Sequence, residues 1–384
     1  MSRDTLRLAG GRVVTPEGVT ERLDVTVADG TIVGLHSASR SDRADVIDVS
    51  GWYVAPGFID LQLNGGWGHD FTTDPASIRD VARRLPCTGV TAFLPTVVTA
   101  PETVRWNALA EIDAIAASGD LGGPSATPLG LHFEGPAISP ARPGAHDTRW
   151  IGLPGAGEVG AWRRERGVVM VTLAPECEGA LDLIRALVSQ GVVVAAGHSE
   201  CSPAEFAAAR RAGVSMATHL FNAMAPFSHR DPGLVGSVLG GDGHAGLICD
   251  GIHVDPLAVS VAWRALGPDR TVLVTDAMAA LGLDAAQTRL GDLPVFIGET
   301  GVRNADGVLA GSNLTLDRAV RNLVSFTGCP AAEAIMTVTR NPASVLGIGD
   351  RGRIEAGARA DVVVLDEALH VVMTFVEGEL AWRS

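Results

Sequence analysis

Two short runs of strand-forming residues, at 192–197 and 215–218, each end directly before a histidine, His198 and His219. The alanine-rich segment Pro203–Ala212 lies between them and predicts a helix, because a serine that can cap its amino terminus precedes the proline. A strand, a helix and a second strand in this order form a parallel crossover unit. We therefore expect both histidines at the carboxyl ends of neighbouring parallel strands, facing one opening.

The same alternation of strand and helix recurs along most of the 384-residue chain. Eight alternating units over this length favour a (β/α)8 barrel over a doubly wound sheet. The expected strands are residues 58–63, 90–95, 129–134, 168–174, 192–197, 215–218, 245–249 and 271–275. The expected helices are residues 75–85, 101–117, 179–190, 203–212, 256–266, 314–327 and 331–339.

Both ends of the chain contain short strand-forming runs separated by turn signals. The Asp29-Gly30 dipeptide, for example, favours a hairpin turn. Two β regions on either side of a central α/β region suggest a small β-sandwich built from both ends. We therefore expect a β-sandwich domain of residues 1–54 and 355–384, and a catalytic barrel domain of residues 55–354.

The composition excludes several functions. The formal net charge of −14 argues against nucleic acid or an anionic membrane as the main partner, and an anionic substrate would need a local cationic pocket. All 30 basic residues are arginine, which excludes a Schiff-base lysine, a Walker lysine and a carbamylated lysine that bridges two metals. The five cysteines are dispersed, and no signal sequence or membrane-spanning run is visible. We therefore expect a reduced, cytoplasmic protein.

The ends of the expected strands carry the residues that can do chemistry. The third strand ends in His132 and Glu134, and two later strands are followed by His198 and His219. One carboxylate and two imidazoles aimed at one point form a site for a divalent metal with an open position, so we predict that Glu134, His198 and His219 are metal ligands. Such a metal lowers the pKa of water, and Asp276, after the last strand, can take the proton and return it to a leaving group. The alternative role of Asp276 is an N-cap of the following helix.

Loops near the same rim supply further polar residues. His146 can donate a hydrogen bond to a developing oxyanion, and Arg230 can clamp a phosphate. Asn222 and the backbone of Ala223 can add neutral donors to the same anion. The spacing leaves the role of His253 open between metal, substrate and structural contacts. A lone loop histidine or arginine is more often a solvated surface residue, so these assignments have a structural alternative.

Nine sequence motifs are distributed along the chain: PGFIDLQLNGG, LHFEGP, GHS, ATHLFNAM, DGIHVD, LVTDAM, LAGS, NPASVLGI and GRIEAGARADVVVLD. Together they resemble the amidohydrolase superfamily and, within it, the N-acetylglucosamine-6-phosphate deacetylase family. The last motif alone indicates only an amidohydrolase, whereas HFEGP, ATHLFNAM and DGIHVD are more specific. The resemblance covers essentially the whole chain.

This resemblance implies a distorted (β/α)8 barrel with a β-sandwich, usually a homodimer. The activity that it implies is hydrolysis of the acetamide of N-acetyl-D-glucosamine 6-phosphate to glucosamine 6-phosphate and acetate. It supports the metal and acid/base assignments and assigns His146 to the substrate carbonyl. It assigns the neutral donors named above and His253 to sugar-phosphate binding, to which we add Met278. It also implies that Arg230 reaches the phosphate across the subunit interface.

One motif departs from the superfamily pattern. Most amidohydrolases carry His-x-His at the end of the first strand, where it holds a second metal, but this chain has Gln62 and Asn64 there. An amide oxygen is a poorer ligand for a borderline-soft metal than an imidazole, and the bridging lysine is missing. We therefore expect one divalent metal per chain, zinc, with ferrous iron as the alternative.

Two other functions stay open. One is a deacylase for a related substrate, such as N-acetylgalactosamine 6-phosphate or an N-acyl amino acid. The other is a non-catalytic amidohydrolase-like scaffold, which would purify without metal or activity. The retained metal and acid/base residues argue against the scaffold.

Overall fold

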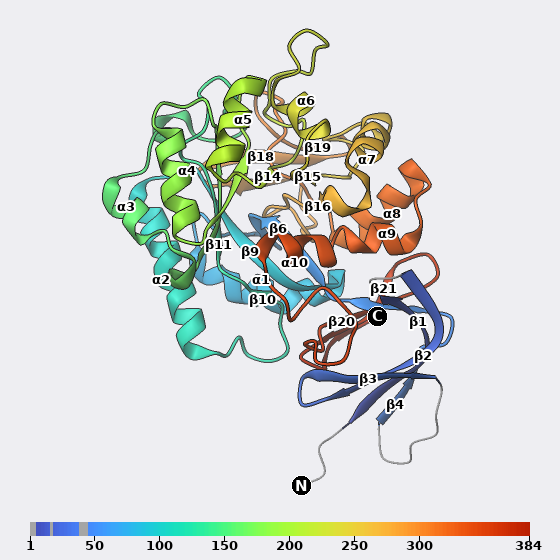
Figure 1. The fold of residues 1–384 in the computed structure, drawn as a ribbon. Helices are drawn as coiled ribbons and strands as arrows, with labels where there is room; N and C mark the ends of the chain where they lie inside the picture. Colours follow the sequence, from blue (N-terminus) through green and yellow to red (C-terminus); the bar gives the residue numbers. More distant parts are fainter. Residues whose placement is uncertain (1–4, 16–17, 38–44) are drawn as a thin grey trace.

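The computed structural model describes residues 5–15, 18–37 and 45–384 of the chain. Its largest sheet is a nearly closed barrel of parallel strands with helices packed around the outside, as predicted (Figure 1). A backbone hydrogen bond from Asp276 to Gln62 (2.9 Å) joins the last strand region to the first. Around the barrel the strands are β6 (Phe58–Leu63), β9 (Val90–Val98), β11 (Leu131–Glu134), β12 (Val168–Leu173), β13 (Val193–Ala196), β14 (Met216–Ala217), β15 (His244–Leu247) and β16 (Thr271–Leu273).

The barrel strands are largely apolar because they are covered on both faces. Every residue of β9 and β12 is buried, for example. The predicted strand 129–134 begins two residues late, as β11, and the short β10 (Thr127–Pro128) lies before its predicted start. Gly130 separates them with a φ of +121°, and a Cβ at this position would lie 2.5 Å from Cγ2 of Val169. Only glycine therefore fits at this break.

The outer helices follow local sequence signals. Helix α5 (Pro203–Ala212) has the predicted bounds, and its amino terminus is a capping box. The Glu205 amide donates to Oγ of Ser202 (3.3 Å), and the Ser202 amide donates to the Glu205 carboxylate (2.8 Å). The other helices are α1 (Ile78–Arg84), α2 (Glu102–Ser118), α3 (Ala156–Ala161), α4 (Ala180–Ser189), α6 (Gly233–Leu239), α7 (Pro256–Arg270), α8 (Leu316–Thr327), α9 (Ala331–Met336) and α10 (Arg340–Leu346).

The predicted helix 331–339 ends three residues early, at the end of α9. The Thr337 hydroxyl donates to the Ala334 carbonyl (2.6 Å), and the Thr339 hydroxyl donates to the Ile335 carbonyl (2.8 Å). These side chains satisfy carbonyls that would otherwise accept from the next helical turn. The chain then starts again as α10.

Both ends of the chain meet in a second sheet, in line with the predicted β-sandwich (Figure 1). Residues from the two ends share one apolar core, in which Val13, Val25, Val364 and Phe375 are buried. The division into domains at residues 54 and 355 stays a prediction. The strands of this sheet are β1 (Leu6–Thr15), β2 (Gly18–Ala28), β3 (Thr31–Ser37), β4 (Asp45–Asp48), β5 (Tyr53–Pro56), β20 (Val362–Leu365), β21 (Val371–Val376) and β22 (Glu379–Arg383).

A small antiparallel sheet follows the last barrel strand and was not predicted. It consists of β17 (Gln287–Leu290), β18 (Leu293–Gly298) and β19 (Gly301–Asn304). A short antiparallel hairpin follows the first barrel strand. Its two strands, β7 (Gly65–Gly66) and β8 (His69–Asp70), have two residues each. Both insertions lie after strand ends, where they can shape the opening of the barrel.

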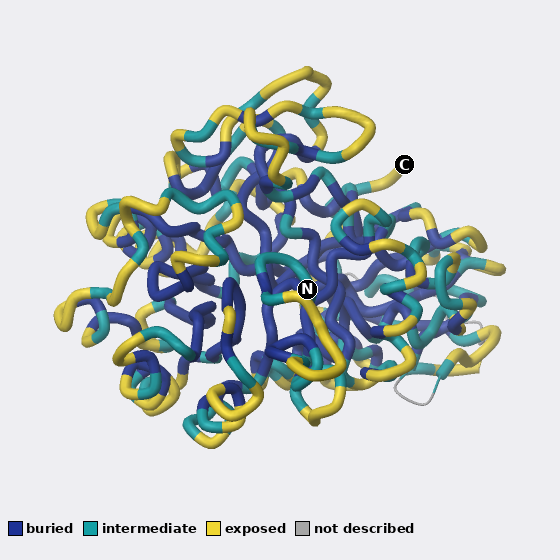
Figure 2. The backbone as a smooth tube through the Cα atoms, turned by 90° about the horizontal axis from the view of Figure 1, so that it is seen from above, coloured by how far each residue is buried: buried dark blue, intermediate teal, exposed yellow. Residues whose placement is uncertain are grey.

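Burial follows this layered arrangement. In Figure 2 the buried trace occupies the middle of the molecule, and exposed segments lie on the outer helices and loops. In the described part of the chain, we find no helix with the length and apolarity needed to cross a membrane.

Candidate metal centre and substrate cavity

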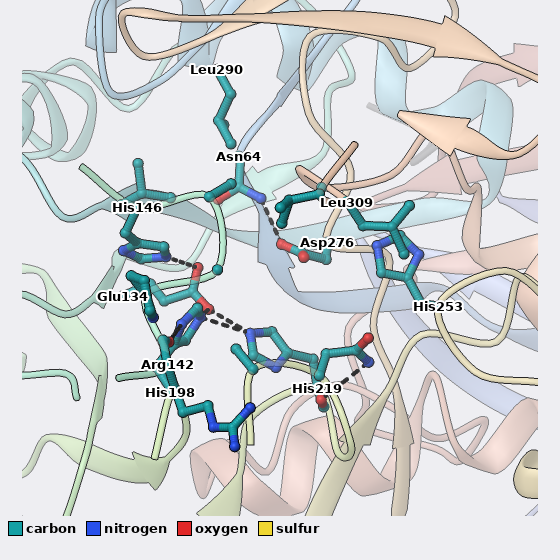
Figure 3. Close-up of a pocket in the computed structure, with 18 of the residues that line it drawn as sticks. Asn64, Glu134, Arg142, His146, His198, His219, His253, Asp276, Leu290 and Leu309 are labelled. Atoms are coloured by element: carbon teal, nitrogen blue, oxygen red, sulfur yellow. Dashed lines mark hydrogen bonds and ion pairs between the residues drawn. The ribbon is translucent and has the colours of Figure 1, made fainter. Parts of the chain in front are cut away.

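A cavity of about 410 Å³ lies among the strand-end residues of the barrel (Figure 3). All predicted site residues line it except Gln62, Arg230 and Met278. The lining residues are Asn64, Val98, Glu134, Ala141, Arg142, Pro143, Gly144, Ala145, His146, His198, His219, Asn222, Ala223, His253, Asp276, Leu290, Val308, Leu309 and Gly311.

Three predicted ligands converge at one place in this cavity. Oε1 of Glu134 lies 3.2 Å from Nε2 of His198 and 2.8 Å from Nε2 of His219. The two ring nitrogens are 3.1 Å apart, and all three residues are buried. One carboxylate oxygen and two imidazole nitrogens within 4.8 Å of one another can hold a metal ion.

An unusual backbone conformation recurs at the strand ends of the cavity. His198, His219 and Asp276 have φ values of 48°, 25° and 48°. Non-glycine residues rarely adopt positive φ, and such positions cluster at functional sites. Each strand ends there, and Figure 3 shows the three side chains facing the same cavity.

The hydrogen bonds of His198 fit a metal ligand. Its Nδ1 lies 2.9 Å from the carbonyl oxygen of Arg142, and because a carbonyl only accepts, we assign the ring proton to Nδ1. Burial lowers the pKa of His198 to about 4, so the ring is neutral and Nε2 presents a lone pair to the cluster. A lone pair so close to a carboxylate oxygen is repelled unless a cation lies between them. The donor set therefore fits a divalent metal.

The charge of Glu134 is set by its neighbours. Burial by itself raises the pKa of this carboxyl, but the adjacent imidazoles of His146, His198 and His219 hold it well below the usual range. For His219 the two effects have opposite signs: burial lowers its pKa, and the hydrogen bond to Glu134 raises it. The net result is a raised pKa of His219. The carboxylate is therefore ionised at neutral pH.

Asp276 is held beside the cluster by two amides. Nδ2 of Asn64 donates to Oδ1 of Asp276 (2.7 Å), and Nε2 of Gln62 donates to the same oxygen (3.1 Å). The Gln62 amide also donates to Oε1 of Glu134 (3.0 Å), so it joins the two carboxylates. Burial and the nearby charge of Glu134 raise the pKa of Asp276 to about 6. This value suits a group that exchanges protons near neutral pH.

His146 lies beside Glu134 in the cavity (Figure 3). Its Nδ1 accepts from the backbone amide of Thr99 (3.3 Å) and lies 2.8 Å from the Thr99 hydroxyl. In the neutral ring the proton is therefore on Nε2, which lies 3.5 Å from Oε2 of Glu134. His146 thus points a hydrogen-bond donor into the cavity.

The neighbouring His132 belongs to the barrel interior. Its Nδ1 lies 3.2 Å from Oγ1 of Thr96, and its Nε2 lies 2.8 Å from Oγ1 of Thr172. Burial lowers the pKa of His132 to about 4, so the ring is a neutral part of a buried hydrogen-bonded layer.

The predicted sugar-phosphate residues reach the cavity only in part. Asn222, Ala223 and His253 line it, and Nδ1 of His253 contacts the Asp250 carboxylate (2.7 Å). Because this contact orients the ring, Nε2 is the nitrogen of His253 that is left for a ligand.

Arg230 and Met278 lie elsewhere. Arg230 is exposed on the segment that precedes α6 and does not line the cavity of its own chain. Met278 does not line the cavity either, because its side chain is buried in the apolar cluster beneath the β17–β19 sheet. Its Sδ accepts a hydrogen bond from the Ala280 amide (3.0 Å).

Sequence reasoning missed two kinds of cavity residue. Arg142 brings a cation to the wall, and its only sequence signal is its place shortly before His146 in the same loop. Leu290 and Leu309 bring apolar surface from the unpredicted β17–β19 region and the segment after it. No local signal in the sequence connects these leucines with the metal cluster.

Comparison with known proteins agrees with this geometry. Residues 53–381 match the Amidohydrolase family. The N-acetylglucosamine-6-phosphate deacetylase of Rattus norvegicus is 38% identical over 399 residues, which cover 100% of this chain and 92% of the rat protein.

Two solved structures share the whole fold. The N-acetylglucosamine-6-phosphate deacetylase of Thermotoga maritima has a TM-score of 0.89 at 35% identity, covering 98% of this chain and 100% of the other. A mutant of the Mycobacterium smegmatis deacetylase, in complex with N-acetyl-D-glucosamine-6-phosphate, has a TM-score of 0.90 at 33% identity, covering 99% and 100%.

Proposed function

Because this chain belongs to the N-acetylglucosamine-6-phosphate deacetylases of the amidohydrolase family, we propose that it hydrolyses N-acetyl-D-glucosamine 6-phosphate to glucosamine 6-phosphate and acetate. The observation that carries the proposal is the buried cluster of Glu134, His198 and His219 beside Asp276, whose pKa is raised to about 6. A metal site next to a proton-exchanging carboxyl can supply both the activated water and the proton transfer that hydrolysis of an unactivated amide needs.

In this proposal Glu134, His198 and His219 hold one divalent metal per chain, zinc, with ferrous iron as the alternative. Such a metal polarises the substrate carbonyl and lowers the pKa of water when bound. Gln62 and Asn64 do not form a second site, since their NH2 groups face carboxylate oxygens. These amides hold the carboxylates in place instead.

Asp276 moves the proton. Its Oδ1 accepts from both Gln62 and Asn64, so Oδ2 is the oxygen left to accept a proton from the attacking water. Oδ2 then returns this proton to the amide nitrogen, because an amine leaves readily and an amide anion does not. With a pKa near 6, the carboxyl can make both transfers.

His146 stabilises the oxygen of the acetyl group. Thr99 holds Nδ1 as an acceptor, so Nε2–H is directed at the developing negative charge. Asn222, Ala223 and His253 bind the sugar phosphate at the other side of the cavity. Binding energy from this remote group then orients the amide for attack.

We also propose a homodimer in which Arg230 of one subunit reaches the phosphate in the other. Its segment is exposed and extends from the barrel before α6, which suits a contact between subunits (Figure 1). The proposal includes a cytoplasmic setting, which the five free cysteines support. It keeps residues 1–54 and 355–384 as one domain and residues 55–354 as the catalytic domain.

The test is acetate release from a panel of N-acetylated compounds by the purified protein. We expect the highest kcat/KM for N-acetyl-D-glucosamine 6-phosphate. A higher value for the galactosamine epimer or for an N-acyl amino acid would replace the proposed substrate. A metal-free protein that releases no acetate from any of them, even after zinc is added, would indicate a scaffold.

A further inference from the structure

Among the described residues that line the cavity, Arg142 is the only arginine, and the sequence contains no lysine. The other polar side chains of the lining are carboxylates, imidazoles and amides. Within the described chain, this guanidinium is therefore the permanent cation of the cavity. In the view of Figure 3 its side chain runs below the cluster of Glu134, His198 and His219.

The backbone of Arg142 is fixed to the metal cluster. The Ser139 amide donates to the His198 carbonyl, the Arg142 amide donates to the Ser139 carbonyl, and Nδ1 of His198 donates to the Arg142 carbonyl, each at 2.9 Å. Gly144, in the same segment, packs closely against His198 and Ala223. A Cβ at this position would lie 3.1 Å from the His198 ring and 3.7 Å from Cβ of Ala223. The loop that carries Arg142 is thus anchored to His198, and through Gly144 it also lies against Ala223, one of the proposed sugar-phosphate residues.

The guanidinium of Arg142 has hydrogen-bond donors that are available to a ligand. Its Nε donates to Glu200, and within the described residues its two terminal NH2 groups have no hydrogen-bond partner. The Arg142 and Glu200 side chains are 32% and 41% exposed, and ion pairs this open to water are weak. A planar pair of NH2 groups suits the oxygens of a phosphate better than it suits water.

We propose that Arg142 binds the phosphate of the substrate within its own chain and so selects phosphorylated amino sugars. This inference rests on the proposed function, which supplies a phosphate monoester. The net charge of −14 repels such a substrate, so a fixed cation in the cavity is needed to reverse the local potential. Arg230 does not do this within one chain, because it lies outside the cavity.

The test compares phosphorylated and unphosphorylated N-acetylglucosamine as substrates of Arg142→Gln. We expect KM for the phosphorylated sugar to rise about tenfold, with kcat near wild type and no change for the unphosphorylated sugar. Competitive inhibition by inorganic phosphate should weaken by a similar factor, and Arg142→Lys should restore part of both effects. Arg185→Gln is the matched control, because Arg185 is an exposed arginine on α4 that pairs with Asp182.

Equal effects of Arg142→Gln on both substrates, or unchanged inhibition by phosphate, would overturn the assignment. Loss of metal from the variant would also count against it, because it would show that Arg142 only supports His198. If the wild type deacetylates nothing, the proposed function fails. Calorimetric titration with inorganic phosphate then still tests Arg142, since wild type should bind phosphate more tightly than Arg142→Gln.

Discussion

The metal end of the cavity is built at strand ends, whereas the sugar-phosphate end is built on loops. Glu134, His198 and His219 are buried and contact one another directly. At the other end Asn222 is only partly buried, and Arg230 is exposed. The barrel therefore fixes the reacting groups, while the loops supply recognition.

We therefore expect substitutions at the two ends of the cavity to change different measured quantities. Substitutions at the metal end should change metal content or kcat, because those side chains meet the reacting atoms. Substitutions at the sugar-phosphate end should change KM, and only for substrates that carry the phosphate. A variant at one end that changed both kcat and the phosphate-dependent KM would show that the two ends do not act separately.

The largest effect is expected for His219→Ala. The variant keeps only Glu134 and His198, and two ligands are too few for a tight zinc site. Metal analysis of the purified protein should show near-complete loss of metal, and acetate release should fall to background. Chelator-treated wild type should recover activity when zinc is added, whereas the variant should not. Full metal content in His219→Ala would remove this residue from the ligand set.

Asp276→Asn should give the next largest effect. The amide cannot accept the proton of the attacking water, so kcat should fall by about a hundred- to ten-thousand-fold. The metal content should stay as in wild type, because Asp276 is not one of the three clustered ligands. A variant with nearly normal turnover would show that another group moves the proton.

The pH dependence of wild-type activity gives a second test of Asp276. Asp276 must be ionised to accept a proton, and its pKa is raised to about 6. Activity should therefore decline as the pH falls through 6, by about tenfold per unit at lower pH. If the rate stays constant well below pH 6 before the metal is lost, Asp276 is not the base.

The metal end could be predicted from the sequence because its geometry follows from strand order. Parallel strands end at one rim, so Glu134, His198 and His219 had to meet once the barrel was recognised. His132 shows the limit of this reasoning. It lies two residues before Glu134 on the same strand, yet it is hydrogen-bonded inside the barrel to Thr96 and Thr172.

The loop end could be predicted only in part, because loop positions depend on contacts distant in sequence. Arg142 was missed, since nothing in its local sequence shows that its backbone is tied to His198. Met278 was placed in the substrate site, but the unpredicted β17–β19 sheet covers it with apolar residues. The hydrogen bonds that set ring protons, such as Thr99 to His146, also lie beyond any sequence pattern.

Gln62→Leu tests whether the amide of Gln62 is needed to position the two carboxylates at the metal end. This change removes one NH2 group that donates to both Glu134 and Asp276. Loss of a hydrogen bond to a charged group should lower kcat by roughly ten- to a hundredfold, with little change in KM. Gln190→Leu is the control, because the Gln190 side chain donates to the backbone carbonyls of Val159 and Trp162, away from the cavity. Unchanged kcat in Gln62→Leu would show that Asn64 alone positions the carboxyl.

Arg230→Ala should give the smallest effect, limited to the phosphorylated substrate. Because Arg230 is exposed, its contact with phosphate is partly screened, and KM should rise about tenfold or less with kcat retained. Mixing this variant with Asp276→Asn under subunit exchange tests which chain supplies the arginine. If Arg230 acts across the interface, a mixed dimer has one site with both an intact Asp276 and an arginine from its partner. Low-KM activity should then reappear, whereas an arginine that serves its own chain would restore nothing.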